Sequence, residues 1–155
     1  MSTPPKPVEP VPPPVDKTVF ELLLVDDDRS FRATLRELFE PYFQIIEADC
    51  GEEALEIVDD HPVDLGLFDM QMRVVTGLDV IRHIKSELPA EVAVVPCILI
   101  TASYTADLLR EAEAAHASAV LKKPVKRQEL LTAVAGALRN SYGDPTLPVR
   151  LGLVS

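Results

Sequence analysis

The chain has 155 residues, which is enough for one domain with a buried core and too short for two domains of ordinary size. Hydrophobic residues make up 47% and charged residues 26% of the sequence, a balance that excludes disorder along the whole length. The formal net charge of -10 disfavours direct binding of nucleic acid, and the chain shows neither a secretion signal nor an apolar run that could span a membrane, so we expect a cytoplasmic protein.

Proline dominates the start of the chain. Seven of the fourteen prolines lie within residues 1–16, where there is no aromatic residue, so this segment cannot bury enough surface to fold. We therefore predict a flexible proline-rich arm over residues 1–17, a folded domain over residues 18–140 and a C-terminal tail over residues 141–155. The arm is interpreted as a tether, with binding to an SH3-type domain as the alternative.

From Val19 onward, short apolar runs alternate with stretches of helical period, which predicts strand-helix-strand units and a parallel sheet. Several of these runs are apolar on consecutive residues, as strands buried on both faces should be. The predicted strands cover residues 19–25, 44–48, 63–68, 96–100 and 119–121.

Five amphipathic helices are expected to follow these strands. The first presents an apolar stripe that includes Phe31 and Leu35 and stops before Pro41. The second is predicted to begin at Asp49, with Glu52 completing a capping-box-like start. Five alternating units joined by right-handed crossovers favour an α/β fold, the flavodoxin-like doubly wound three-layer sandwich, with a five-stranded parallel sheet of order 2-1-3-4-5 and five helices.

Acidic residues follow two strands that are neighbours in this sheet. Asp26, Asp27 and Asp28 end the first strand and Asp69 ends the third, at the crevice where open sheets of this kind bind ligands. Two carboxylates about 4 Å apart repel each other by about 4 kcal/mol at an effective dielectric constant of about 20, so a divalent cation would stabilise them. Oxygen ligands favour Mg²⁺ or Ca²⁺, and Mg²⁺ leaves positions open for phosphate oxygens. Helix capping is the structural alternative, and it explains Asp28 but not Asp69 on a separate strand.

Two further polar side chains are expected at the same crevice. Thr101 ends the fourth strand and offers a hydroxyl group, and Lys123 follows the fifth strand and offers an ammonium group. Because these strand ends carry no Ser, Cys or His, we interpret the carboxylate of Asp69 as the nucleophile of a phosphoryl transfer. Lys123 and the cation would neutralise charge on the transferring group, while Thr101 would bond a phosphoryl oxygen.

Four short motifs stand in order along the chain, each at the end of a predicted strand. They are Leu24-Val25-Asp26-Asp27, Asp69 with Gly77 eight residues later, Ile100-Thr101-Ala102 and Lys123-Pro124. A single piece of this kind is a weak signal, but the ordered set is a strong one. Together the motifs resemble the response regulator receiver domain, over about residues 19 to 140.

This resemblance implies a phosphoacceptor switch of a two-component phosphorelay. Asp69 would receive a phosphoryl group from a sensor histidine kinase or a phosphotransfer protein, with Mg²⁺ as the cofactor. Asp27, Asp69 and the backbone carbonyl of Gln71 would bind the metal, and Asp26 would hold its water ligands. The protein would catalyse only its own phosphorylation and dephosphorylation, so it would not be an enzyme acting on other substrates.

The resemblance also implies roles around the phosphoryl group. Thr101 and Lys123 would contact it, the Lys123–Pro124 peptide would be cis, and Gln71 and Ser103 would influence the rate of dephosphorylation. With no output domain expected after the folded domain, the chain would act by binding a downstream protein through the predicted fourth helix, fifth strand and fifth helix. A homodimer is an open alternative.

The sequence departs from the family pattern at four positions. Arg73 stands where the family usually has proline, and Val120 replaces the usual aromatic switch residue. A branched aliphatic side chain cannot report a movement of Thr101 by rotating a ring, so either another group couples the site to the surface or signalling is weakened. His116 replaces a glycine and Val125 a phenylalanine, which we interpret as drift.

Two other functions fit parts of the pattern. A haloacid-dehalogenase-type phosphatase also uses a strand-end aspartate and magnesium, but it needs a second acid two residues after the nucleophile, where this chain has Gln71. A receiver-like scaffold that binds partners without being phosphorylated is suggested by Val120 and Arg73, since fold alone does not determine activity.

Overall fold

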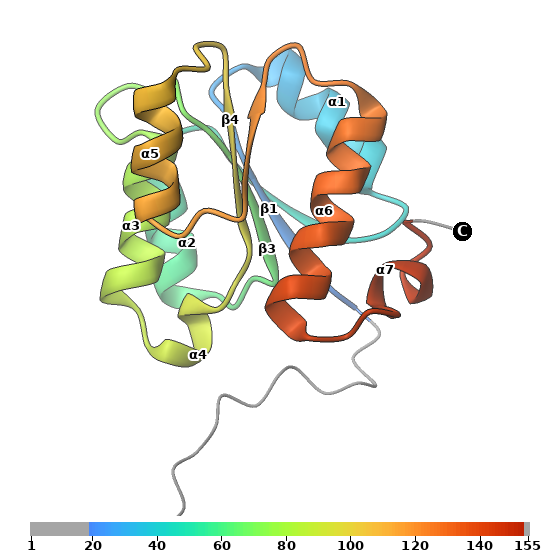
Figure 1. The fold of residues 1–155 in the computed structure, drawn as a ribbon. Coiled ribbons are helices and arrows are strands. Elements are labelled where there is room, and N and C mark those ends of the chain that lie inside the picture. Colours follow the sequence, from blue (N-terminus) through green and yellow to red (C-terminus); the bar gives the residue numbers. More distant parts are fainter. Residues whose placement is uncertain (1–18, 154–155) are drawn as a thin grey trace, which may run out of the picture.

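The computed structural model describes residues 19–153 and shows a five-stranded parallel sheet between two layers of helices (Figure 1). The strand order β2-β1-β3-β4-β5 confirms the predicted doubly wound fold. The strands are β1 (Glu21–Val25), β2 (Gln44–Ala48), β3 (Leu65–Asp69), β4 (Cys97–Thr101) and β5 (Ala119–Lys122). The predicted arm over residues 1–17 lies outside the described residues.

Seven helices occur within residues 19–153, two more than the sequence predicts. They are α1 (Arg29–Phe39), α2 (Gly51–Asp60), α3 (Gly77–Glu87), α4 (Ala90–Ala93), α5 (Ala106–Ala114), α6 (Arg127–Tyr142) and α7 (Leu147–Arg150). The additional helices α4 and α7 have four residues each, which is too short to display a helical hydrophobic period. Among the described residues, no helix has the length and apolar character that crossing a membrane requires.

Alternate residues of the strands face two separate apolar layers. Leu22 and Leu24 of β1 pack in the layer of α1, α6 and α7, whereas Leu23 and Val25 pack in the layer of α2, α3 and α5. Figure 1 shows α1 and α6 on one face of the sheet and α2, α3 and α5 on the other. Every residue of β3 and β4 is buried, and burial on both faces explains why these strands are apolar up to their last residue.

The start of α2 differs from the prediction. Its N-cap is Cys50 rather than Asp49, so the predicted start is wrong by one residue. The Sγ atom of Cys50 accepts a hydrogen bond from the N–H group of Glu53 over 3.5 Å. Cysteine is not among the residues usually preferred at an N-cap, and the spacing of Asp49 and Glu52 therefore favoured the wrong position. The expected cap of α1 is present, since Asp28 accepts from the first turn of that helix.

The C-terminal segment packs against the rest of the domain. The expected boundary at residue 140 falls inside α6, which ends at Tyr142 and is capped by Gly143 with a φ angle of 63°. The chain then turns back, and Leu147 and Leu153 are buried in the apolar layer of α1 and α6. Pro148 lies in the first turn of α7, where a missing N–H group costs no hydrogen bond. Residues up to 153 therefore belong to the folded unit.

We expect Leu147→Ala to destabilise the protein by about 2 to 4 kcal/mol, because it leaves a cavity in this layer. Urea denaturation followed by circular dichroism measures the change in the free energy of unfolding. The control is Val149→Ala on the same helix, since Val149 is 53% exposed and its truncation should cost less than about 0.5 kcal/mol. Small and equal effects of the two substitutions would show that α7 does not pack in solution.

Candidate functional site

The parallel register of β1 and β3 brings their terminal carboxylates together. Val25 pairs with Phe68, so Asp26 and Asp69, which follow them, lie side by side at the carboxyl edge of the sheet. Asp26 is 2% and Asp69 is 3% exposed, whereas Asp27 is exposed. Oxygen atoms of the three carboxylates all lie within 4.8 Å of one another. The structure thus gathers the acidic residues selected from the sequence into one cluster.

Lys123 supplies a positive charge to this cluster. Its Nζ atom lies 3.0 Å from Asp26 Oδ2 and 3.4 Å from Asp69 Oδ1. The peptide N–H group of Lys123 donates to the carbonyl of Thr101 over 2.8 Å, which ties the end of β5 to the end of β4. The Lys123–Pro124 peptide is cis, as the resemblance implies. Lys123 therefore reaches across the crevice to both buried acids.

The close packing of charged groups in the cluster shifts the pKa values of Asp69 and Lys123. Burial, followed by the charge of Asp26, raises the pKa of Asp69 from its ordinary value of 3.8 to about 6, although Lys123 opposes the change. Burial disfavours the charged form of Lys123, but the hydrogen bond and charge of Asp26, together with Asp69, raise its pKa above the ordinary value. Lys123 contacts two of the three carboxyl groups of the cluster, so one positive charge stands against three acidic groups.

The donor set of the cluster fits Mg²⁺. Asp26, Asp27 and Asp69 supply the oxygen atoms that this cation prefers, and the exposure of Asp27 leaves one side of the cluster open to water. A divalent cation would also offset the repulsion by Asp26 that, after burial, raises the pKa of Asp69. The backbone carbonyl of Gln71, which the resemblance adds to the ligand set, belongs to the loop that follows β3.

Thr101 and Gln71 connect the ends of β3 and β4. Asp69 pairs with Ile100, so Thr101 ends β4 next to the acidic cluster, where it is fully buried. Gln71 Nε2 donates to Thr101 Oγ1 over 2.8 Å, and Gln71 Oε1 accepts from the N–H group of Ala102 over 2.9 Å. The sequence pattern indicated no such partner for the Gln71 side chain, because nothing local to residue 71 reports on a loop that lies 30 residues away.

The structure shows the local backbone or packing at three of the departures from the receiver pattern, at His116, Arg73 and Val120. His116, where the resemblance has glycine, adopts a φ of 63°, a region in which glycine carries no steric cost. Val74, beside Arg73, is 87% exposed with a φ of 67°, which for a β-branched residue stores strain of about 1 to 3 kcal/mol. Val120 packs, partly buried, against the layer of α2, α3 and α5, and it presents no aromatic ring to the surface.

Comparison with known proteins identifies relatives of this chain. A family model described as response regulator receiver domain matches residues 22–135. The chain is 33% identical over 141 residues to the transcriptional regulatory protein CpxR of Escherichia coli (strain K12), and the match covers 83% of this chain but only 58% of CpxR. It is 30% identical over 119 residues to the chemotaxis protein CheY of Halobacterium salinarum, and that match covers 76% of this chain and 96% of CheY.

A solved structure shares the architecture. The receiver domain of the sensor histidine kinase PA1611 from Pseudomonas aeruginosa PAO1 superposes with a TM-score of 0.67 at 23% sequence identity, covering 81% of this chain and 99% of that chain. At this level of identity the likeness establishes the fold. That domain holds a magnesium ion coordinated in its active site cleft.

The raised pKa of Asp69 predicts a pH-dependent stability in the absence of divalent cations. Folded Asp69 retains its proton up to about pH 6, whereas the unfolded chain releases it near 3.8. The folded state therefore binds more protons between these values, and the free energy of unfolding contributed by this group falls as the pH rises through them. Denaturation in EDTA between about pH 4 and about pH 7 measures this slope.

Asp69→Asn is the matched variant, because it keeps the size of the side chain and removes its charge. We expect it to flatten the slope and to raise the free energy of unfolding near neutral pH by about 1 to 3 kcal/mol in EDTA. Saturating Mg²⁺ should narrow the difference between the two proteins, since the cation neutralises the same repulsion. If the free energy of unfolding changes with pH by the same slope in both proteins, the charge at position 69 does not destabilise the fold.

Proposed function

Because this chain belongs to the response regulator receiver domain family, we propose that it is a phosphoacceptor switch of two-component signalling and that Asp69 is the residue that accepts the phosphoryl group. The observation that carries this proposal is the burial of the Asp69 carboxylate beside Asp26, Asp27 and Lys123. A carboxylate in that position can act as a nucleophile, with the ammonium group of Lys123 beside it to offset negative charge.

The proposed reaction forms an acyl phosphate on Asp69. An oxygen of the carboxylate bonds to phosphorus, the bond between phosphorus and the imidazole nitrogen of a phosphohistidine donor breaks, and the electron pair of that bond returns to the nitrogen. The Nζ atom of Lys123, 3.4 Å from Asp69 Oδ1, offsets negative charge on the transferring group. Thr101, at the end of the adjacent strand, would bond a phosphoryl oxygen once the group is attached.

We propose Mg²⁺ as the cofactor of this site. Asp26, Asp27 and Asp69, with the carbonyl of Gln71, would hold the ion, which supplies electrostatic stabilisation of the transferring group. The excess negative charge of the cluster supports this assignment, and so does the magnesium ion in the active site cleft of the PA1611 receiver domain. We propose no phosphatase activity on other substrates, because Gln71 stands where a haloacid-dehalogenase-type phosphatase needs an acid.

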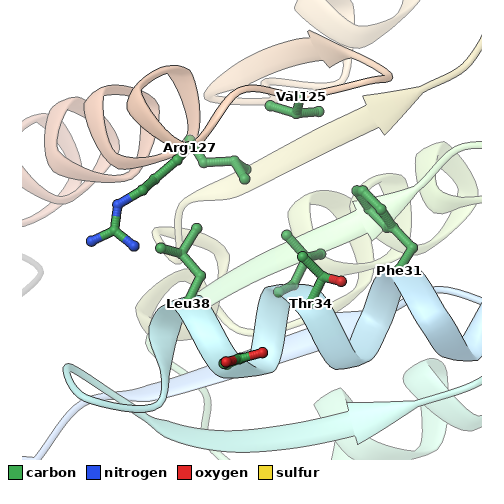
Figure 2. A pocket seen from close by; sticks show the side chains of 8 residues that line it. Phe31, Thr34, Leu38, Val125 and Arg127 are labelled. Atoms are coloured by element: carbon green, nitrogen blue, oxygen red, sulfur yellow. The ribbon is translucent and has the colours of Figure 1, made fainter.

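A pocket of about 400 Å³ beside the site supports an interaction with the phosphoryl donor. It lies between α1 and the start of α6, and Figure 2 shows Phe31 and Leu38 of α1 facing Val125 and Arg127 across it. The centroid of the Phe31 ring lies 4.3 Å from Lys123 Nζ, so a residue that lines the pocket contacts the lysine of the acidic cluster. We propose that a histidine kinase or phosphotransfer protein docks there with an apolar surface and presents its phosphohistidine to Asp69.

Incubation with acetyl phosphate and Mg²⁺, followed by intact-mass measurement, tests the proposed function. We expect the wild-type protein to gain the mass of one phosphoryl group and Asp69→Asn to gain none. No gain by the wild-type protein in the presence of Mg²⁺ would overturn the proposal. It would favour instead a scaffold that binds partners without phosphorylation, the alternative suggested by Val120 and Arg73.

Lys123→Met should slow phosphorylation by acetyl phosphate about 100-fold or more, because it removes the ammonium group that offsets charge in the transition state. The initial rate of mass gain under saturating Mg²⁺ measures this effect. Lys122→Met is the matched control, since Lys122 is the exposed residue directly before Lys123, at the end of β5, and its substitution should leave the rate unchanged. Equal phosphorylation rates in the two variants would show that Lys123 has no role in the reaction.

A further inference from the structure

The hydroxyl group of Thr101 has all of its hydrogen-bonding positions occupied. A hydroxyl offers one donor and two acceptor positions. Thr101 Oγ1 donates to the carbonyl of Ser103 over 3.1 Å, and it accepts from the N–H group of Ser103 over 3.0 Å and from Gln71 Nε2 over 2.8 Å. Its single proton is therefore committed to Ser103, and both of its lone pairs have donors.

The two partners of the Gln71 amide determine its orientation. Gln71 Oε1 accepts from the N–H group of Ala102 over 2.9 Å, which leaves Nε2 to face Thr101. Exchanging the oxygen and nitrogen atoms would set an N–H group of Gln71 against that of Ala102, and the hydrogen bond would be lost. The backbone N–H group of Gln71 also donates to Asp69 Oδ1 over 3.2 Å. One residue thus links the candidate phosphoacceptor to the loop between β4 and α5.

We propose that the Gln71 side chain is a latch that holds Thr101 and the β4–α5 loop in the unphosphorylated arrangement. The proposal rests on the proposed function, in which Thr101 donates to a phosphoryl oxygen on Asp69. For that bond the Thr101 proton must leave the carbonyl of Ser103, so the hydroxyl group must turn. When the hydroxyl group turns, the lone pair that now accepts from Gln71 Nε2 points elsewhere. The hydrogen bond between Gln71 and Thr101 then breaks, which opens the latch. Gln71 is therefore a positioning residue that opposes the activated arrangement.

Opening of the latch would also carry the signal to the surface. The bond from Ala102 to Gln71 holds the first residue of a loop that includes Tyr104, an aromatic residue that is 44% exposed. Val120 has no ring to rotate, so release of this loop is the change that a partner protein would read. The aromatic side chain at the surface then comes from the β4–α5 loop rather than from β5.

Gln71→Met tests the latch, because methionine has a similar length and can make neither hydrogen bond. With saturating Mg²⁺, we expect this variant to bind beryllofluoride about three- to tenfold more tightly than the wild-type protein, the factor that one net hydrogen bond contributes to an equilibrium. Beryllofluoride stands in for the phosphoryl group and is not hydrolysed, so an altered dephosphorylation rate cannot produce this result. Gln128→Met, at an exposed glutamine of α6, is the matched control and should bind as the wild-type protein does.

Hydrogen exchange of the Ala102 amide provides a second measurement, made without Mg²⁺ or beryllofluoride. The Ala102 N–H group donates to Gln71 Oε1, so we expect slow exchange in the wild-type protein and in Gln128→Met and faster exchange in Gln71→Met. This readout reports the unphosphorylated arrangement directly. It does not depend on whether Asp69 accepts a phosphoryl group.

The outcomes separate the latch from the proposed function. If the wild-type protein binds beryllofluoride and Gln71→Met binds it equally or more weakly, the latch is overturned and the proposed function stands. If neither protein binds beryllofluoride in the presence of Mg²⁺, the proposed function fails and the switching role of Gln71 fails with it. An Ala102 amide that exchanges equally fast in both proteins also overturns the latch.

Discussion

Repulsion between carboxylates that the parallel sheet forces together is the interaction on which the rest of this structure depends. Asp26 and Asp69 follow paired residues of β1 and β3, so neither can withdraw without disturbing the centre of the sheet. Burial, followed by the charge of Asp26, raises the pKa of Asp69 to about 6, although Lys123 offsets part of the charge. The arrangement that weakens the fold in the absence of a cation is also the one that suits a cation and a phosphoryl group.

A short chain of hydrogen bonds connects the Asp69 carboxylate to the end of β4, so a change of charge at Asp69 acts on these bonds. The backbone of Gln71 contacts the carboxylate, and the side chain of the same residue holds Thr101 and Ala102 at the end of β4. In the proposed switch this chain would exchange the observed hydrogen-bonded arrangement for a second one, which is what a two-state switch requires. Val120 packs against the layer of α2, α3 and α5 and has no aromatic ring, so in the proposed switch the β4–α5 loop would carry the change to the surface.

Much of the fold and the position of the site could be predicted because they depend on local patterns. Continuous apolar runs marked β3 and β4, and the polar residue that ends each run, Asp69 or Thr101, marked the carboxyl edge of the sheet. The patterns failed where a helix was too short to repeat, as in α4 and α7, and where an uncommon residue made the cap, as Cys50 does for α2.

The sequence by itself therefore determined the order of the strands and which polar side chains stand at their ends. Both follow from patterns that span only a few residues, namely the hydrophobic period and the residue type that ends each strand. Only the tertiary structure decided which atoms meet there. The contacts of Lys123 with Asp26 and of Gln71 with Thr101 join residues 97 and 30 positions apart. They depend on strand register and on the path of two loops, and the burial of Leu147 likewise depends on how the chain turns back after α6. No local pattern of side chains encodes those distances.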